Sequence, residues 1–338
     1  MYEPVPTNAR RPIALWRWVL LLAVLLGIAI GYRCYYIDYW TRYPVLDYSK
    51  RLGCLAQEYS KKTDIVIYIP SPAQWEARRR QVMRKMRPEL GGAHVWFIVG
   101  TLDGPRLERQ AQGLAAVRKE AAEEPSPLVR YRFVPCRDFG DEPDNPNGTS
   151  STTCKTYEAL KFIAAHYASD PPRFVWRGAD DAYLDLGVFR ARIAPRLQTC
   201  RLFFGRVRFP TPLDSQDLEL YPRQPKLYAL FGISKFGKYV AGMGFLMSWD
   251  VVQFVGQSPI PPRLTWCEDV MVGQWLLFYD IDFVDFRSVN PRVGMVNGDE
   301  PPEHFPAILL AHRLSKAQWT ALERRPRGDT SSEFLQAT

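Results

Sequence analysis

The chain has 338 residues, of which 46% are hydrophobic and 24% are charged, and its formal net charge is +8. This composition supports a sizeable buried core and excludes an intrinsically disordered protein. The basic residues are spread along the chain and no nucleic-acid-binding motif is present. The positive charge therefore favours a small phosphorylated ligand, or simple solubility, over a nucleic acid.

The N-terminal part contains one long apolar segment, residues 13–32, which is interrupted only by Arg17 and predicts a transmembrane helix. A cleaved signal peptide is the alternative, but the polar leader before it is long, so we expect an uncleaved signal anchor. The expected organisation is a cytoplasmic tail at 1–12, an anchor at 13–32, a stem at 33–62, a globular domain at 63–325 and a flexible tail at 326–338.

Apolar, β-branched runs alternate with charged helical segments from residue 63 onward. We expect strands over 64–70, 94–100 and 128–134. One helix is expected to begin at Ser71-Pro72, and a second to cover 107–123. This order is typical of an α/β domain with a largely parallel sheet.

Two segments are loops by composition. Residues 138–151 contain Asn147, which begins an Asn-Gly-Thr acceptor for glycosylation in a lumenal protein. After a predicted helix over 152–167 and a predicted strand over 203–207, the Pro- and Tyr-rich segment 210–231 is irregular. A segment of that length is uncommon unless it is functional, for example as a lid or an acceptor-binding loop.

The cysteines lack the close spacing that a zinc site needs. They are therefore either buried thiols or long-range disulfides, and the cellular compartment decides between the two. The six are Cys34, Cys54, Cys136, Cys154, Cys200 and Cys267.

An acidic pair, Asp180 and Asp181, follows the apolar run 174–176 and a break at Gly178-Ala179. Ligands bind at strand ends in open α/β sheets, and carboxylates there suit a hard divalent cation such as Mn²⁺ or Mg²⁺. A turn or a helix cap is the alternative interpretation, because Asp is common in both.

Three later motifs also admit two interpretations. Gly242 and Gly244 precede an apolar strand, where they allow a ligand to approach the backbone or form a simple bulge. Glu268 and Asp269 begin an apolar helix, either as caps or with one acid as a general base. His312 ends the strand that begins near residue 308, and it either completes a metal site or is structural. A helix is expected to start just after it, at Ser315.

Taken together, these motifs resemble glycosyltransferase family 31, the β-1,3-galactosyltransferase and β-1,3-N-acetylglucosaminyltransferase type, which is related to core 1 synthase and Fringe. The similarity covers roughly residues 64–319. The motifs that carry it are Arg79-Arg80-Gln-Val-Met-Arg84, Phe97-Ile-Val-Gly100, Lys155-Thr156, the stretch 174–183, the stretch 239–248, Glu268-Asp269-Val270 and His312-x-x-Ser315.

The resemblance implies a GT-A type, Rossmann-like nucleotide-sugar-binding fold with a mostly parallel central sheet, preceded by a single transmembrane helix. It implies a single-pass type II Golgi membrane protein with a lumenal catalytic domain, for which a homodimer is an allowed assembly. The implied reaction is inverting transfer of a hexose from a UDP-sugar to a glycan acceptor, forming a β-1,3 linkage with Mn²⁺ as cofactor. Galactose is the favoured sugar and N-acetylglucosamine the next.

The family motifs also imply roles for individual residues. Asp269 would be the catalytic base, and Asp181 and His312 the metal ligands. The donor-binding residues would be Asp180, Arg80, Arg84, Lys155 and Arg177, and the acceptor-binding residues would be Gly242, Met243, Gly244 and Glu268.

The sequence departs from the family pattern at several positions, and Gly178 and Ala182 make the predicted metal loop smaller than usual. Ala179 stands where the first Asp of the family motif is expected, and Met243 replaces a glycine. Because the last Asp of the motif is the expected metal ligand, the loss of the first one bears on donor choice. It also motivates a different prediction, a catalytically silent relative that acts as a lumenal glycan-binding or scaffolding protein.

Overall fold

The computed structural model describes residues 26, 57–102, 107–138, 151–208, 238–258, 268–276, 279, 281–297 and 307–324. Asn147, the predicted lid at 210–231, most of the stem and both predicted tails lie outside the described residues. The chain divides into two compact units, Met1–Tyr48 and Ser49–Thr338. The fold below is that of the second unit.

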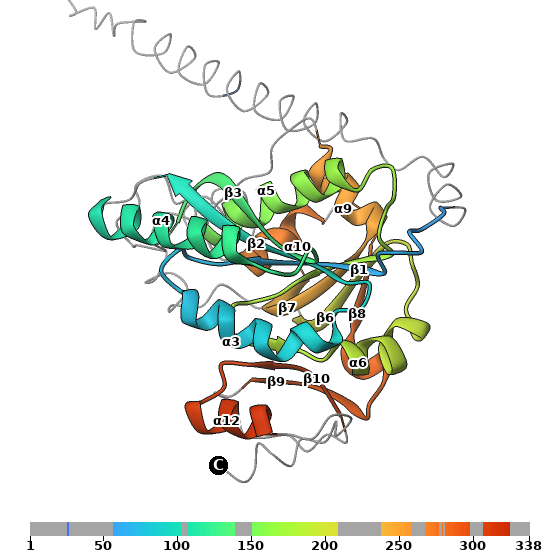
Figure 1. The fold of residues 1–338 in the computed structure, drawn as a ribbon. Helices are drawn as coiled ribbons and strands as arrows, with labels where there is room; N and C mark the ends of the chain where they lie inside the picture. Colours follow the sequence, from blue (N-terminus) through green and yellow to red (C-terminus); the bar gives the residue numbers. More distant parts are fainter. Residues whose placement is uncertain are drawn as a thin grey trace, which may run out of the picture. The chain divides into compact units, whose positions relative to one another are not determined.

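A seven-stranded sheet forms the centre of this unit, in the order β3-β2-β1-β4-β7-β6-β8 (Figure 1). Strand β7 runs antiparallel to both of its neighbours, and the other strand pairs are parallel. The predicted α/β architecture with a mostly parallel sheet is therefore confirmed. The strands are β1 (Ile65–Pro70), β2 (His94–Leu102), β3 (Val129–Arg137), β4 (Phe174–Arg177), β6 (Leu202–Arg208), β7 (Tyr239–Ser248) and β8 (Asp282–Asp285).

Helices cover both faces of this sheet (Figure 1). Alternate side chains of β2 show the division: Phe97 packs in the cluster that contains Met83 of α3, whereas the ring of Trp96 contacts Phe162 of α5. Helices α3 (Glu76–Met86) and α4 (Leu107–Glu123) lie on the first face. Helices α5 (Ser151–His166), α9 (Trp249–Gly256) and α10 (Glu268–Trp275) lie on the second.

The connections change face at β1. The chain moves outward from β1 through α3 and α4 to β3, and then returns through α5 on the opposite face to β4, on the other side of β1. The carboxyl ends of β1 and β4 therefore form a topological switch point, which is where open α/β sheets bind ligands.

A second, three-stranded sheet has the order β5-β10-β9, formed by β5 (Ala182–Leu184), β10 (Ala307–His312) and β9 (Val293–Asn297). Its apolar side chains, including Leu310, join the main hydrophobic cluster. The remaining helical segments are short apart from α12. They are η1 (Arg87–Glu89), α6 (Leu186–Val188), η2 (Phe189–Ile193), η3 (Ala194–Arg196), α11 (Phe286–Val289) and α12 (Lys316–Arg324).

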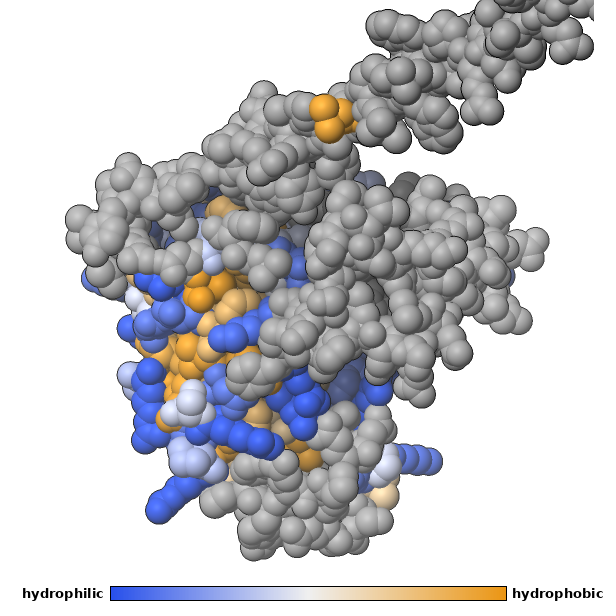
Figure 2. Space-filling model, turned by 180° about the vertical axis from the view of Figure 1, so that it is seen from behind, coloured by the Kyte–Doolittle hydropathy of each residue, from blue (hydrophilic) through white to orange (hydrophobic). Residues whose placement is uncertain are grey.

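The core is built mainly from apolar side chains that strands and helices bury together. Strand β1 is buried along its whole length, which fits a strand with helices on both faces. Each fully buried large apolar side chain stabilises the fold by roughly 1.5–3 kcal/mol. Figure 2 shows one face of the molecule, on which an area of hydrophobic residues is bordered by hydrophilic ones. Among the described residues, the only large hydrophobic side chain counted as exposed is Leu26.

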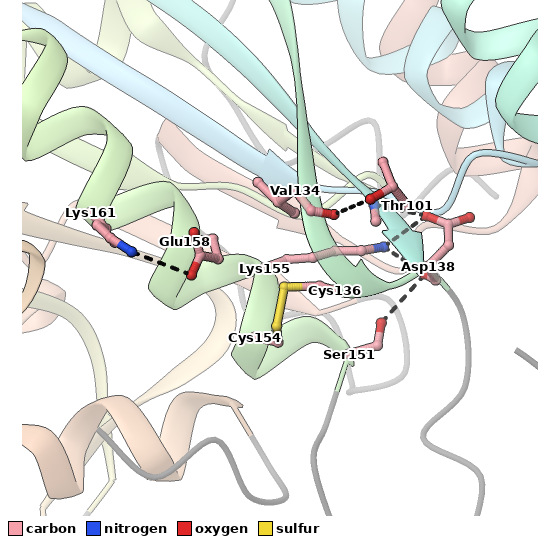
Figure 3. Close-up of a disulfide and its surroundings, with 10 residues drawn as sticks. Thr101, Val134, Cys136, Asp138, Ser151, Cys154, Lys155, Glu158 and Lys161 are labelled. Carbon is pink, nitrogen blue, oxygen red and sulfur yellow. Dashed lines mark hydrogen bonds and ion pairs between the residues drawn. A yellow bond between two sulfur atoms is a disulfide. The ribbon is translucent and has the colours of Figure 1, made fainter. Parts of the chain in front are cut away.

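A disulfide joins Cys136 near the end of β3 to Cys154 in the first turn of α5 (Figure 3). The two Cα atoms are 5.8 Å apart, a distance that suits a disulfide. Cys200 is also disulfide-bonded. Of the two alternatives for the cysteines, buried thiols or disulfides, Cys136, Cys154 and Cys200 therefore follow the second.

The predicted transmembrane helix over residues 13–32 requires a correction. In the part of the chain that the structure describes, no helix is long and apolar enough to cross a bilayer, which takes about 20 mostly apolar residues. Apart from Leu26, residues 13–32 lie outside that part. A membrane-spanning helix is therefore not part of the fold as described.

Two predicted helix starts have different outcomes. Helix α3 begins at Glu76 and not at Ser71, because a turn closed by Trp75 N–H donating to the Pro72 carbonyl comes first. The late helix begins after Ser315 as predicted. There the Gln318 N–H donates to Ser315 Oγ, and the Ser315 N–H donates to Gln318 Oε1, which satisfies two otherwise free donors.

The disulfide gives a direct test of how β3 and α5 are linked. The double replacement of Cys136→Ala and Cys154→Ala removes a covalent link across a sequence separation of 18 residues. We expect the free energy of unfolding to fall by about 3 kcal/mol, because the unfolded chain loses that constraint. Urea unfolding without reductant measures the difference. Equal stability of the two proteins would contradict a stabilising role for this link.

Candidate active site

The first acid of the Asp180–Asp181 pair is buried at the switch point. Ser71, directly after β1, donates from its Oγ to Asp180 Oδ2 at 2.9 Å, and Arg79 Nη1 donates to the same Ser71 Oγ at 3.2 Å. Burial raises the pKa of Asp180 to about 6; the Asp181 charge adds to the rise, and the Ser71 hydrogen bond opposes it. Asp180 is thus held by the scaffold, with little of its side chain accessible.

The second acid, Asp181, is partly exposed and lies beside His312. Antiparallel pairing of β5 with β10 sets His312 opposite Ala182, and the Arg313 N–H donates to the Asp181 carbonyl at 3.1 Å. His312 Nε2 is 3.2 Å from Asp181 Oδ1. Burial acts to raise the pKa of Asp181, but the hydrogen bond and charge of His312, with the charges of Arg78 and Arg177, lower it overall.

Arg78 is a site residue that the sequence reasoning did not find. Its Nη1 is 3.9 Å from Asp180 Oδ1 and 4.0 Å from Asp181 Oδ2, and its guanidinium lies over the Trp75 ring, 4.0 Å from the ring centre. The helical period could have indicated it. Residues 78 and 80 point about 200° apart on a helix, so only one of them can face the acids.

The two predicted donor-binding arginines of α3 lie elsewhere. Arg80 is 65% exposed and pairs with Glu76 one turn earlier on the same helix. Arg80 and Arg84 line a cavity of about 400 Å³ together with side chains of α4, among them Glu120 and Glu123. Neither has a contact with Asp180 or Asp181 among the interactions of the described residues.

The predicted donor-binding Lys155 is buried and already bonded (Figure 3). Its Nζ donates to the Asp138 carbonyl at 2.5 Å, to Asp138 Oδ1 at 3.1 Å and to the Ser71 carbonyl at 3.3 Å. Asp138 also accepts from the N–H groups of Ala73 and Gly100, at 2.7 and 3.1 Å. Lys155 therefore ties together chain segments at the ends of β1, β2 and β3 and fixes the backbone of Ser71.

Arg177 and Glu268 form a buried ion pair between the end of β4 and the start of α10. Arg177 Nε donates to Glu268 Oε1 at 2.9 Å, and Arg177 Nη2 donates to Glu268 Oε2. Thr156 Oγ1 donates to the same carboxylate. Both members are buried, with exposed fractions of 6% and 7%. Each of the two therefore has the other as its main partner.

The predicted base, Asp269, is partly exposed and is held by two backbone donors. Gly242 N–H donates to Asp269 Oδ2 at 2.8 Å, and Val270 N–H donates to Asp269 Oδ1 at 2.9 Å. Burial raises the pKa of Asp269, while these hydrogen bonds and the charge of Arg177 oppose the rise. A partly exposed carboxylate with a raised pKa suits a general base.

The three residues of the glycine motif have different surroundings. A Cβ atom at Gly242 would lie 3.3 Å from Asp269 Oδ2, so glycine gives the carboxylate its room. At Gly244 a Cβ would lie 2.9 Å from a methyl carbon of Leu310. Met243 is buried in the main hydrophobic cluster. Of these three residues, which are among the four predicted acceptor-binding positions, the structure therefore brings Gly242 alone into contact with Asp269.

Asp181 and His312 fit two ligands of a Mn²⁺ or Mg²⁺ ion. Ligands at right angles and about 2.1 Å from such an ion lie about 3 Å apart, close to the observed 3.2 Å. Carboxylate suits both ions, whereas imidazole nitrogen is a ligand of transition-metal ions, so the pair fits Mn²⁺ better than Mg²⁺. No group of three or more potential ligands occurs among the described residues, so substrate oxygens and water would complete the coordination.

Two of the four cationic residues predicted to bind the donor, Lys155 and Arg80, can be told apart by stability. Lys155→Met leaves the Asp138 carboxylate buried without its cation, and we expect a loss of about 3–5 kcal/mol in the free energy of unfolding. Arg80→Met is the matched control, since it removes an exposed cation and should change stability by no more than about 0.5 kcal/mol. Thermal and urea unfolding measure both. Equal losses would contradict the different placements.

Comparisons with known proteins match residues 153–287 to the family described as Galactosyltransferase. No curated protein matches the chain. The solved structures with similar folds include galactosyltransferase LgtC in complex with donor and acceptor sugar analogs. It has 12% identity, coverage of 81% of this chain and 95% of that one, and a TM-score of 0.40. Mannosyltransferase Ktr4p from S. cerevisiae in complex with GDP has 11% identity, coverage of 69% and 75%, and a TM-score of 0.33.

These structural likenesses are too distant to carry a function to this chain. The family match is different, since it includes both acidic pairs, Arg177 and Gly242; of the candidate chemical groups, Arg78 lies before its start and His312 beyond its end. The match confirms the predicted resemblance: residues 153–287 are similar to the galactosyltransferase family, and this segment supports a glycosyltransferase.

Proposed function

We propose that the chain is an inverting transferase that moves a hexose from a UDP-sugar to a hydroxyl of a glycan acceptor and forms a β-1,3 linkage. One observation carries this proposal. Asp181 and His312 are 131 positions apart in the sequence, yet Asp181 Oδ1 and His312 Nε2 lie 3.2 Å from each other, directly beyond the carboxyl end of β4. A second partly exposed carboxylate, Asp269, is available for proton transfer.

Asp269 supplies the base. Its carboxylate takes the proton of the acceptor hydroxyl while the acceptor oxygen forms a bond to the anomeric carbon of the sugar. The bond between that carbon and the diphosphate oxygen breaks, and its electron pair leaves with UDP. Attack from the face opposite to UDP inverts the anomeric carbon, so no covalent enzyme intermediate is needed.

Asp181 and His312 would hold the divalent cation, with Mn²⁺ as the expected ion. When bound, the cation would supply positive charge to the departing diphosphate. Arg78, about 4 Å from both acids of the pair and exposed, adds a second positive charge at the same edge. Asp180, held by Ser71, keeps the loop between β4 and β5 in place.

Galactose is the favoured donor sugar because the matched family is described as Galactosyltransferase, and N-acetylglucosamine is the alternative. The chain's Ala179 is partly buried against the main hydrophobic cluster and brings no charge to the site. The other proposal suggested by Ala179 is a catalytically silent glycan-binding protein. It predicts binding of UDP-sugar without transfer or hydrolysis.

We further propose that this domain works in an oxidising compartment, the lumen of the Golgi being the expectation. The support is chemical. Disulfides persist in secretory compartments and are rare in the cytosol, and the described residues include the Cys136–Cys154 disulfide and a disulfide-bonded Cys200.

The base role is tested with Asp269→Asn in the full-length chain. With UDP-galactose and a panel of synthetic glycoside acceptors, we expect transfer to fall at least about 100-fold, because a missing general base costs on the order of 10²–10⁴. Slow hydrolysis of UDP-galactose by water should persist, and UDP affinity should be unchanged. Transfer at the wild-type rate would refute the base, and a wild-type protein that binds UDP-galactose without any turnover would favour the silent alternative.

The metal role is tested by binding, without turnover. Calorimetric titration of the full-length chain with UDP should show an affinity that rises when Mn²⁺ is added. Asp181→Ala and His312→Ala should each abolish that increase, and we expect a loss of at least about tenfold in Mn²⁺-dependent affinity. Glu123→Ala, on α4, is the matched acidic control and should bind as the wild type does. A Mn²⁺ effect that survives in both site variants would contradict the assignment.

A further inference from the structure

A contribution to stability does not by itself explain why Arg177 and Glu268 form a buried ion pair. Removing two charges from water is costly, and replacing a buried ion pair with apolar side chains is often neutral or stabilising. The pair is nevertheless almost fully buried and connects three elements, β4, α5 and α10, through Arg177, Thr156 and Glu268. Its hydrogen bonds reach the carboxylate of Asp269.

Two routes join the pair to Asp269. In the first, Arg177 Nη1 donates to the Gly242 carbonyl, and the N–H of the same glycine donates to Asp269 Oδ2 at 2.8 Å. In the second, Glu268 precedes Asp269 in the chain, so the salt bridge from β4 fixes the residue at which α10 begins. Both routes act on the position of one carboxylate.

The donors and acceptors of the pair are also largely taken. Arg177 uses Nε, Nη1 and Nη2 within the protein, and both oxygens of Glu268 accept hydrogen bonds from Arg177, one of them also from Thr156. With exposed fractions of 6% and 7%, neither side chain offers a surface to a sugar or a diphosphate. This differs from the predicted roles in donor and acceptor binding.

We propose that Arg177 and Glu268 are positioning residues that hold the Asp269 carboxylate through Gly242 and the start of α10, and that they do not bind substrate. This inference rests on the proposed function of Asp269 as the base. Among the described residues, the charges that act on Asp269 are those of Arg177 on β4 and of Glu268 on the same helix. Loss of the Arg177 charge therefore also changes the proton affinity of the base.

The test compares Arg177→Met, Arg177→Lys and the double variant Arg177→Met/Glu268→Leu with the wild type, all as full-length chains. The double variant leaves no unpaired buried charge, so it should fold even where Arg177→Met does not. Asp64→Asn is the matched control. It weakens another two-bond salt bridge, with Arg190, at the amino end of β1.

We expect the Arg177→Met and double variants to bind UDP within about twofold of the wild type. At saturating UDP-galactose they should transfer about 100-fold more slowly, since a misplacement of about 1 Å can cost that much. Arg177→Lys, which keeps the charge, should recover part of the turnover, and Asp64→Asn should retain all of it. A loss of UDP affinity with normal turnover at saturation would show that the pair binds substrate, and unchanged turnover would also overturn the proposal.

A measurement without substrate separates this inference from the proposed function. NMR of the chain labelled with ¹³C in aspartate carboxyls follows the titration of Asp269, assigned by its absence in Asp269→Asn. In Arg177→Met that titration should move to higher pH, and an unchanged titration would overturn the positioning role. If Asp269→Asn transfers normally, the base proposal fails, while the NMR result still decides whether the pair controls this carboxylate.

Discussion

The buried ion pair between Arg177 and Glu268 is the interaction on which the candidate active site depends. It joins the carboxyl end of β4 to the first residue of α10, and through the Gly242 backbone it reaches Asp269. The charge of Arg177 also opposes the rise in pKa that burial causes at Asp180 and Asp269. One guanidinium thus influences both acidic pairs, from a strand at the topological switch point.

Each acidic pair divides its work between a buried and a partly exposed member. Asp180 is bonded to Ser71 and Glu268 to Arg177, whereas the neighbouring acid in each pair is partly exposed. Lys155, which donates to the carbonyls of Asp138 and Ser71, supports the first pair because it fixes the backbone of Ser71. The buried members, Asp180 and Glu268, hold their chain segments in position. The accessible members, Asp181 and Asp269, are available for the proposed metal binding and proton transfer.

Part of this arrangement could be predicted from the sequence. The apolar strands and the order of elements were sufficient to predict the α/β sheet. The family motifs were sufficient to predict that Asp181 and His312 lie together. The motifs could not show that Lys155 and Glu268 are buried, because partners such as Asp138 and Thr156 lie far away in the chain. Nor could a run of arginines show which one faces the acids, since that depends on where α3 begins.

In the proposed mechanism, Asp269 activates the acceptor hydroxyl for direct displacement of UDP. The anomeric configuration of the product formed from UDP-galactose, determined by ¹H NMR before any equilibration, tests this step. We expect a β-linked galactose, because the donor carries its UDP in the α configuration and one displacement inverts that centre. A product with the α linkage would refute the mechanism, since retention requires a route other than one displacement by an acceptor that Asp269 has deprotonated.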